Sequence, residues 1–129
     1  MVIVDSSVWI EVLRGKDTHE SAAFERMAAE EEIALADLSL FEILQGVKAE
    51  AAFHKVQEQL RVFTVVPIGG ESAAVSAARK SRALKNRGVQ ASAADCLLAS
   101  YCIDNDVRFL TADKDFAAFA RYLGLDVIR

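Results

Sequence analysis

Short apolar, β-prone segments alternate along this chain with longer segments of helical periodicity, a pattern that excludes all-helical and all-β folds. The predicted strands are residues 1–4, 33–36, 63–66, 107–110 and 126–128. The predicted helices are residues 8–13, 18–31, 38–47, 49–61, 71–86, 92–104 and 114–122. Strands separated by helices can lie parallel in one central sheet that is covered on both faces. The sequence therefore predicts an α/β fold with a central parallel sheet.

Turn and capping residues set the expected helix boundaries. Ser6 or Ser7 is placed to cap the first helix, and Gly15 ends it. Ser92 starts the helix at 92–104, and Gly88 separates that helix from the one before it.

The chain is long enough for one domain with its own core. Its 129 residues correspond to a single domain, residues 1–129. Folding at this size buries roughly two-thirds of the unfolded surface. Cys96 and Cys102 lie about 9 Å apart along one predicted helix, too far for a disulfide. With 53% apolar residues, the core needs neither a disulfide nor a structural metal.

The sequence carries no signal for a membrane or for zinc. No apolar run reaches about 18 residues, and the segment Met1–Asp5 lacks the basic residues of a signal peptide. His19 and His54 have no partner motif, which argues against zinc sites and histidine-dependent catalysis. We therefore expect a cytoplasmic protein without membrane contact.

Acidic residues follow two of the predicted strands. Asp5 comes directly after residues 1–4, and Asp113 and Asp115 follow residues 107–110, together with Thr111. The carboxyl ends of parallel strands meet at one edge of the sheet, where ligands of α/β proteins bind. We expect these side chains to lie at that edge.

Two further acids lie within predicted helices. Asp95 is in the first turn of its helix, on the side of Leu98, Ala99 and Cys102, so its carboxylate faces partly inward. A helical wheel turns Glu42 away from the apolar side of its helix, towards solvent. Structural interpretations are also open, because Asp5, Thr111 or Asp113 could cap a helix and Asp95 or Asp115 could favour a helix dipole.

Carboxylates that converge need a counter-charge. Two unit charges about 5 Å apart repel by roughly 3 kcal/mol at an effective dielectric near 20. No Lys or Arg adjoins Asp5, Glu42 or Asp95 in sequence. Oxygen ligands without His or Cys favour Mg²⁺ or Mn²⁺. Such a site is suited to phosphodiester hydrolysis, in which metal ions activate water and stabilise the leaving oxygen.

Four segments carry these acids in a fixed order. They are Val4-Asp5-Ser6-Ser7-Val8-Trp9-Ile10, Phe41-Glu42-Ile43-Leu44-Gln45-Gly46, Ala94-Asp95-Cys96-Leu97-Leu98-Ala99 and Phe109-Leu110-Thr111-Ala112-Asp113-Lys114-Asp115-Phe116. Together, in a chain of this length, they resemble the PIN-domain ribonucleases, specifically the VapC-type toxins of toxin–antitoxin pairs. The resemblance extends from Val2 to Ile128 and implies a PIN-domain-like α/β/α sandwich.

The resemblance also assigns residues. It implies that the catalytic and metal-binding acids are Asp5, Glu42, Asp95 and Asp113, with Asp115 as a further metal ligand. Ser7 and Thr111 would add hydroxyl groups beside them. Glu42 thereby moves from the surface into the site, against the helical wheel. Of the last two acids, Asp113 ranks first as the ligand.

The resemblance also implies an activity and partners. Single-stranded RNA would enter the acidic cleft with Mg²⁺, for which Mn²⁺ can substitute. A metal-bound water would attack in line and leave a 5′-phosphate and a 3′-hydroxyl. The family also implies a homodimer and a cognate VapB-type antitoxin, whose groove we place at helices 18–31 and 38–61.

The charge of the chain is unevenly distributed. The net charge of −4 opposes RNA binding. Positive residues nevertheless concentrate between residues 79 and 87. From this segment we predict RNA-backbone contacts by Arg79, Arg82, Lys85 and Arg87. The alternative is a solvated helix face.

Two other functions fit parts of the pattern. A receiver-type phosphoacceptor domain also has acids at strand ends, but it needs paired acids after the first strand, and Asp5 is alone. A PIN-like module that binds RNA or a partner without cutting is the second alternative. Metal-dependent cleavage that is lost when Asp5 is replaced would distinguish an enzyme from such a module.

Overall fold

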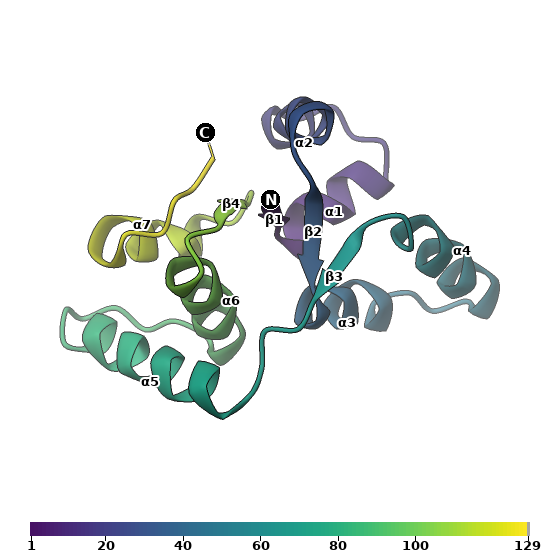
Figure 1. Ribbon diagram of the computed structural model, residues 1–129. Helices are drawn as coiled ribbons and strands as arrows, with labels where there is room; N and C mark the ends of the chain where they lie inside the picture. The colour runs from purple at the N-terminus through teal and green to yellow at the C-terminus, as the bar shows by residue number, and fades with distance from the viewer. Residues whose placement is uncertain (129) are drawn as a thin grey trace.

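A computed structural model describes residues 1–128, which form a four-stranded parallel sheet between two layers of helices (Figure 1). The strands, in sheet order β3-β2-β1-β4, are β1 (Val2–Val4), β2 (Ile33–Ala36), β3 (Thr64–Val66) and β4 (Arg108–Leu110). All three pairings are parallel. The predicted α/β sandwich is therefore confirmed.

The helices fall close to their predicted ranges. They are α1 (Ser6–Leu13), α2 (His19–Glu30), α3 (Asp37–Gln45), α4 (Glu50–Leu60), α5 (Glu71–Lys85), α6 (Ala93–Asp104) and α7 (Ala117–Leu123), with a 3-10 turn, η1 (Lys114–Phe116), before α7. Ser92 caps α6 as predicted, since its hydroxyl accepts a hydrogen bond from the Asp95 N–H at 3.1 Å. Among residues 1–128, no helix is both long and apolar enough to cross a bilayer.

Two predictions of local structure are wrong. The strand expected at residues 126–128 reduces to a single bridge between Phe109 and Val127. Gly124 ends α7 in the left-handed region at φ 78°, and the chain then pairs with β4 at this one bridge. The cap expected at Ser6 or Ser7 is also wrong, because Ser6 is already helical; Asp5, the alternative cap, occupies the N-cap position without a side-chain capping bond.

The first helical layer, α1 to α4, packs on one face of the sheet. Val2 and Val4 of β1 point to this face, as successive residues of a strand alternate between faces. The Trp9 ring meets Phe24 and Phe63 edge to face, with centroids 5.0 and 4.8 Å away. Its indole N–H donates to the Val4 carbonyl at 3.0 Å, which fixes α1 against the end of β1.

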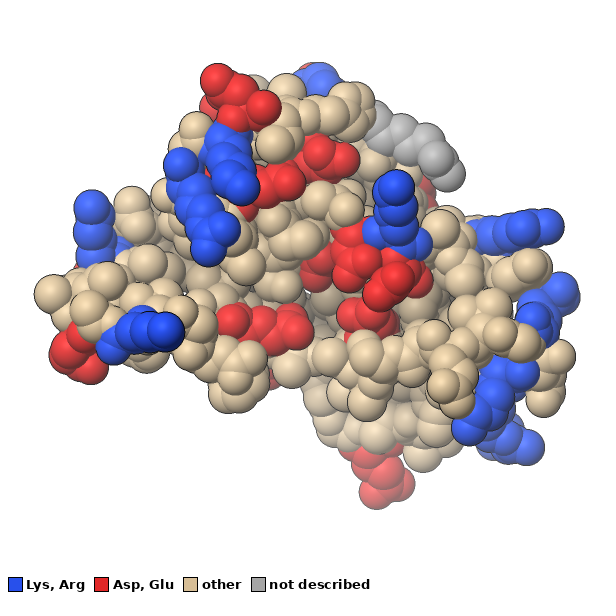
Figure 2. Space-filling view, turned by 180° about the vertical axis from the view of Figure 1, so that it is seen from behind, with Lys and Arg blue, Asp and Glu red and all other residues tan. Residues whose placement is uncertain are grey.

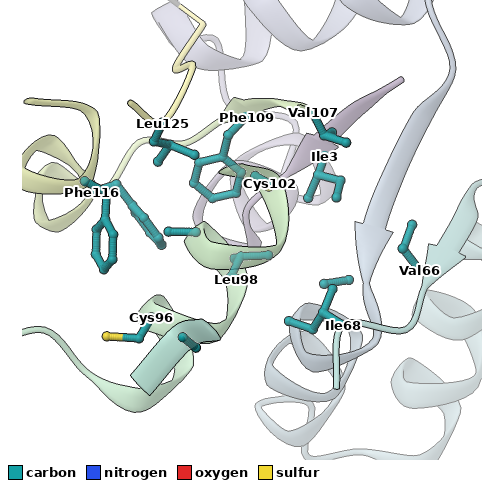
Figure 3. Close-up of a cluster of buried hydrophobic side chains, with 14 of the residues drawn as sticks. Ile3, Val66, Ile68, Cys96, Leu98, Cys102, Val107, Phe109, Phe116 and Leu125 are labelled. Atoms are coloured by element: carbon teal, nitrogen blue, oxygen red, sulfur yellow. The ribbon is translucent and has the colours of Figure 1, made fainter. Parts of the chain in front are cut away.

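The second layer, α5 to α7, packs on the opposite face. Ile3 and Phe109 point to this side and join side chains of α6 and of the segment after β4 in one buried cluster (Figure 3). Cys96 and Cys102 belong to this cluster as free thiols. The cluster holds α6 against the sheet and thereby sets the position of its first turn, which carries Asp95.

Candidate active site

The site is built on the adjacent carboxyl ends of β1 and β4. Val4 pairs with Leu110, and the next backbone N–H, that of Asp5, donates to the Leu110 carbonyl at 2.9 Å. Asp5 and Thr111, the first residues beyond the two strands, are therefore neighbours. The Thr111 hydroxyl donates to Asp5 Oδ2 at 2.9 Å, and the Asp5 side chain is buried.

Ser7 brings a second hydroxyl to the same carboxylate oxygen. Ser7 Oγ donates to Asp5 Oδ2 at 2.7 Å and accepts the Ala112 N–H at 3.1 Å. The first turn of α1 is thus tied to the loop after β4. The two hydroxyls expected near the acids both contact Asp5, and together they fix its orientation.

Asp113 is held by the same loop. Its N–H donates to Thr111 Oγ1 at 3.0 Å, and its Oδ1 accepts the Asp115 N–H at 2.9 Å, which makes it the N-cap of η1. The capping alternative for Asp113 is therefore correct as a description of its backbone role. The same carboxylate also contributes to a cluster of acids, so capping and cluster membership coexist.

Asp95, Asp113 and Asp115 each offer a carboxylate oxygen, and these oxygens lie within 4.8 Å of one another. Asp95 comes from the first turn of α6, whereas the other two follow β4. Asp95 and Asp113 are partly buried and Asp115 is exposed. Residues separated by about 20 positions in sequence thus converge on one point.

The electrostatics of the site show that the acids are crowded. Burial raises the pKa of Asp95 to about 6, and the carboxylates of Asp113 and Asp5 add to the rise. Burial also raises the pKa of Asp5, while hydrogen bonds from the Ser7 and Thr111 hydroxyls oppose that rise. The negative charges therefore destabilise one another in the absence of a cation.

Glu42 lies on the α3 side of the site. Its side chain is partly buried, and its pKa is raised by burial and next by the carboxylate of Asp5. The solvent-facing position given by the helical wheel is therefore wrong. A helix at the edge of a cleft can turn a polar side into that cleft, which apolar periodicity does not register.

One site residue was not singled out by the sequence. The Ser6 side chain lies close enough to Glu42 to oppose the rise in the pKa of that carboxyl. Ser7 therefore holds Asp5, and Ser6 lowers the pKa of both Asp5, through its backbone N–H, and Glu42. The sequence signal for Ser6 is the Asp5-Ser6-Ser7 run directly after the first strand, which is equally typical of a helix cap.

The donor set fits a hard divalent cation. Oxygen ligands alone surround the site, from carboxylates of several elements, and the raised pKa values indicate unbalanced negative charge. Mg²⁺ and Mn²⁺ prefer such ligands. Asp95, Asp113 and Asp115 are the residues whose oxygens are close enough together to share one ion.

The basic residues predicted to contact RNA lie in and just after α5. Arg79, Arg82, Lys85 and Arg87 are all exposed. Lys80 differs from them, since its ammonium group binds Asp104 at 2.8 Å and is directed towards α6. Figure 2 shows acidic side chains around the middle of one face and a column of basic side chains along the side where α5 and α7 lie.

Comparison with known proteins identifies relatives over nearly the whole chain. Residues 2–122 match the family model of the PIN domain. Ribonuclease VapC11 of Mycobacterium tuberculosis is 26% identical over 128 residues, which cover 97% of this chain and 96% of that protein. VapC ribonuclease Mb1587 of Mycobacterium bovis matches to the same extent.

Solved structures share the fold at low sequence identity. VapBC2 from Rickettsia felis, bound to a DNA fragment from its promoter, superposes with a TM-score of 0.81 at 16% identity, covering 99% of this chain and 98% of that one. VapC20 of Mycobacterium tuberculosis, a toxin that cleaves the sarcin–ricin loop, gives a TM-score of 0.66 at 13% identity, with coverages of 92% and 94%. The resemblance seen in the four acidic segments is confirmed, and the chain belongs to the PIN domain family.

Proposed function

We propose that this protein is a divalent-metal-dependent endoribonuclease that acts as the toxin of a toxin–antitoxin pair. The observation that carries the proposal is the convergence of Asp95, Asp113 and Asp115 beside the buried Asp5. The names of the VapC relatives support ribonuclease chemistry. The fold supports it as well, because its topology brings these acids to one edge of the sheet.

Each acid has a proposed part. Asp95, Asp113 and Asp115 would hold Mg²⁺ or Mn²⁺, with Asp5 and Glu42 completing the negative site. A bound divalent cation would supply Lewis-acid activation of water and neutralise charge at the scissile phosphate. The Ser7 and Thr111 hydroxyls would keep Asp5 oriented, and an acid of the cluster would accept the proton of the attacking water. The products would carry a 5′-phosphate and a 3′-hydroxyl.

The RNA would reach this site past the basic side of the molecule. Arg79, Arg82, Lys85 and Arg87 are exposed, and no salt bridge within residues 1–128 occupies them. Such side chains contribute to RNA affinity by neutralising phosphates, irrespective of base sequence. They would offset the repulsion that a chain of net charge −4 exerts on RNA.

A cognate VapB-type antitoxin would bind in a groove on α3 and α4, and the toxin itself would form a homodimer. A pocket of about 360 Å³ lies there, lined by Leu40, Phe41, Leu44 and Phe53 among others. Phe41 is 59% exposed. Exposed aromatic rings beside an apolar groove are typical of protein–protein contact sites.

The decisive test is cleavage of end-labelled RNA by protein freed of any bound partner. Mg²⁺, Mn²⁺ and EDTA would be compared, with Asp5→Asn and Asp95→Asn beside the parent and Asp17→Asn as a surface control. We expect cutting in either metal, none in EDTA, and none by the two cluster variants. Fragment ends would identify the bond that is broken.

Binding without cutting remains the alternative function. Tight RNA binding that survives Asp95→Asn, with no cleavage of transfer RNA, ribosomal RNA or message in either metal, would support a non-catalytic module. A metal titration followed by calorimetry would then show whether the acids bind a cation at all.

A further inference from the structure

Two arginines lie over one tyrosine ring, that of Tyr122 in α7. The Arg87 guanidinium carbon lies 4.5 Å from the centroid of the Tyr122 ring, and that of Arg121 lies 5.1 Å from it. Both distances are within the range of a cation–π interaction. The three residues, Arg87, Tyr122 and Arg121, are called the arginine–tyrosine platform below.

The fold holds this platform in place. Arg87 follows the end of α5, where its N–H donates to the Leu84 carbonyl at 2.9 Å and the Val89 N–H donates to the same carbonyl at 3.0 Å. Gly88, at φ 79°, allows the tight turn between them. Tyr122, in the last turn of α7, is packed against the buried cluster of its layer. The ring is therefore a fixed surface on which the guanidinium groups lie.

The charges on the platform are unbalanced. Neither Arg87 nor Arg121 forms a salt bridge within residues 1–128, although acids outnumber bases by nineteen to fifteen in the chain. Two guanidinium groups that share one ring repel each other. A guanidinium group has five N–H donors, so one held over a ring keeps donors that can bind an anion. The platform is thus arranged for an anionic partner.

The platform also lies close to the acid cluster along the chain. Asp113 and Asp115 directly precede α7, and its seven residues span about 10 Å. Arg87 continues the exposed basic residues of α5 towards α7. An RNA strand whose scissile phosphate lies at the acids would therefore have a neighbouring part of its backbone within reach of the platform.

We propose that the arginine–tyrosine platform binds the phosphodiester backbone of single-stranded RNA beside the cleavage site, an inference that rests on the proposed ribonuclease function. Tyr122 acts by orienting the two arginines and does not stack on a base, since guanidinium groups lie over its ring. The platform contributes affinity that is independent of base sequence. Arg121 and Tyr122 thereby join the four basic residues predicted from the sequence.

The test is RNA binding as a function of salt. Fluorescence anisotropy of a labelled single-stranded RNA would be measured in EDTA at several salt concentrations, with intact RNA verified on a gel. We expect Arg121→Gln to reduce the slope of log K against log salt by about 0.7, and Arg87→Gln with Arg121→Gln to reduce it by about 1.4. Lys16→Gln is the matched control. Lys16 is exposed, and its substitution removes one positive charge outside the platform.

The ring is tested separately from the charges. Tyr122→Phe keeps the ring and is expected to bind RNA like the parent, whereas Tyr122→Leu should weaken binding by about fivefold because the arginines lose their support. Circular dichroism melting of both variants would verify that α7 remains folded. Equal RNA affinities of the folded Phe and Leu variants would overturn the orienting role of Tyr122.

The outcomes separate this inference from the proposed function. Unchanged salt slopes in the arginine variants of a protein that still cuts RNA would overturn the platform alone. Reduced slopes in a protein that never cuts RNA would support the platform and refute the nuclease. Arginine variants that lose a protein partner while keeping RNA affinity would identify a protein-docking surface and overturn the proposal.

Discussion

The Thr111 hydroxyl donates a hydrogen bond to Asp5 Oδ2 at 2.9 Å, joining the residues that directly follow β4 and β1. The bond exists because Val4 pairs with Leu110, so the next residue of each strand falls beside the other. Thr111 also accepts the Asp113 N–H at 3.0 Å. The Thr111 side chain thereby links the buried Asp5 to the loop that carries Asp113 and Asp115.

We expect Thr111→Val to impair cleavage through Asp5. The Thr111 hydroxyl lowers the pKa of Asp5, whose pKa burial raises. Removing this donor favours the protonated acid, so the acidic limb of the pH–rate profile should move to higher pH. Loss of a hydrogen bond that orients a ligand typically costs tenfold or more in activity. Thr64→Val is the control, since Thr64 binds Glu32 at the surface. An acidic limb that stays in place would contradict this role.

Asp95→Asn should stabilise the metal-free protein while abolishing cleavage. The pKa of Asp95 is about 6 in the folded protein, against an ordinary value of 3.8. The folded state therefore binds more protons than the unfolded state between these values, and stability falls as pH rises through this range. In EDTA, the melting temperature of the parent should be lower at pH 7.5 than at pH 5. The asparagine variant should show a smaller difference, and the part that is left belongs to Asp5 and Glu42, whose pKa values are also raised.

Bound Mg²⁺ should make the parent more stable than Asp95→Asn, the reverse of their order in EDTA. A cation that binds only the folded state stabilises it in proportion to the logarithm of its concentration. Mg²⁺ should therefore raise the melting temperature of the parent at pH 7.5 much more than that of Asp95→Asn. Asp17→Asn, at an exposed position, should behave like the parent throughout. If Asp95→Asn is less stable than the parent in EDTA at pH 7.5, the Asp95 carboxylate stabilises the fold, which contradicts this prediction.

The sequence was informative wherever an acid follows a strand. Asp5 and Asp113 could be placed at one edge of the sheet because parallel strands end together. The convergence of Asp95 on Asp113 and Asp115 depends on the packing of α6 against the sheet, and only its partly inward face could be inferred. Four of the five predicted strands form, while the last one is too short to pair beyond one bridge.

The parts of the site that the sequence does not predict depend on contacts between residues far apart in the chain. Glu42 was misplaced by the helical wheel because periodicity separates apolar from polar sides and does not distinguish solvent from a polar cleft. Ser7 is expected beside the acids from the family resemblance alone, and Ser6 only as a helix cap, since the same small hydroxyl residues serve both helix ends and carboxylate networks. The stacking of Arg87 on Tyr122 joins residues 35 positions apart and has no local signal.

Lys80→Met should weaken the attachment of α5 to α6. The Lys80 ammonium group binds Asp104 at 2.8 Å, Ser76 at 2.7 Å and the buried Ser100 hydroxyl at 3.0 Å. We expect a loss of about 1 kcal/mol in urea unfolding, a value kept small by the exposure of Asp104. Lys55→Met, at an exposed position, should have little effect.

The effect of Lys80→Met should depend on pH in a defined direction. The hydrogen bond from Lys80 lowers the pKa of Asp104 below its ordinary value of 3.8. The ion pair therefore contributes fully above that value and is lost as pH falls below it. The stability difference between parent and variant should stay constant from pH 7 to pH 5 and narrow towards pH 3. A constant difference over the whole range would assign the loss to packing alone.

Phe41→Glu should weaken antitoxin binding and leave the fold intact. Phe41 is 59% exposed at the pocket that it lines with Leu44 and Phe53, so its loss costs little in the free protein. Truncation of a central aromatic residue at an interface commonly costs about 2 kcal/mol or more, which is roughly thirtyfold in affinity. Isothermal calorimetry with the antitoxin would measure this loss, with Val62→Glu as the control because Val62 is 81% exposed and lies outside that pocket. If antitoxin affinity is unchanged and light scattering instead shows a smaller particle, the pocket serves the contact between two copies of the toxin.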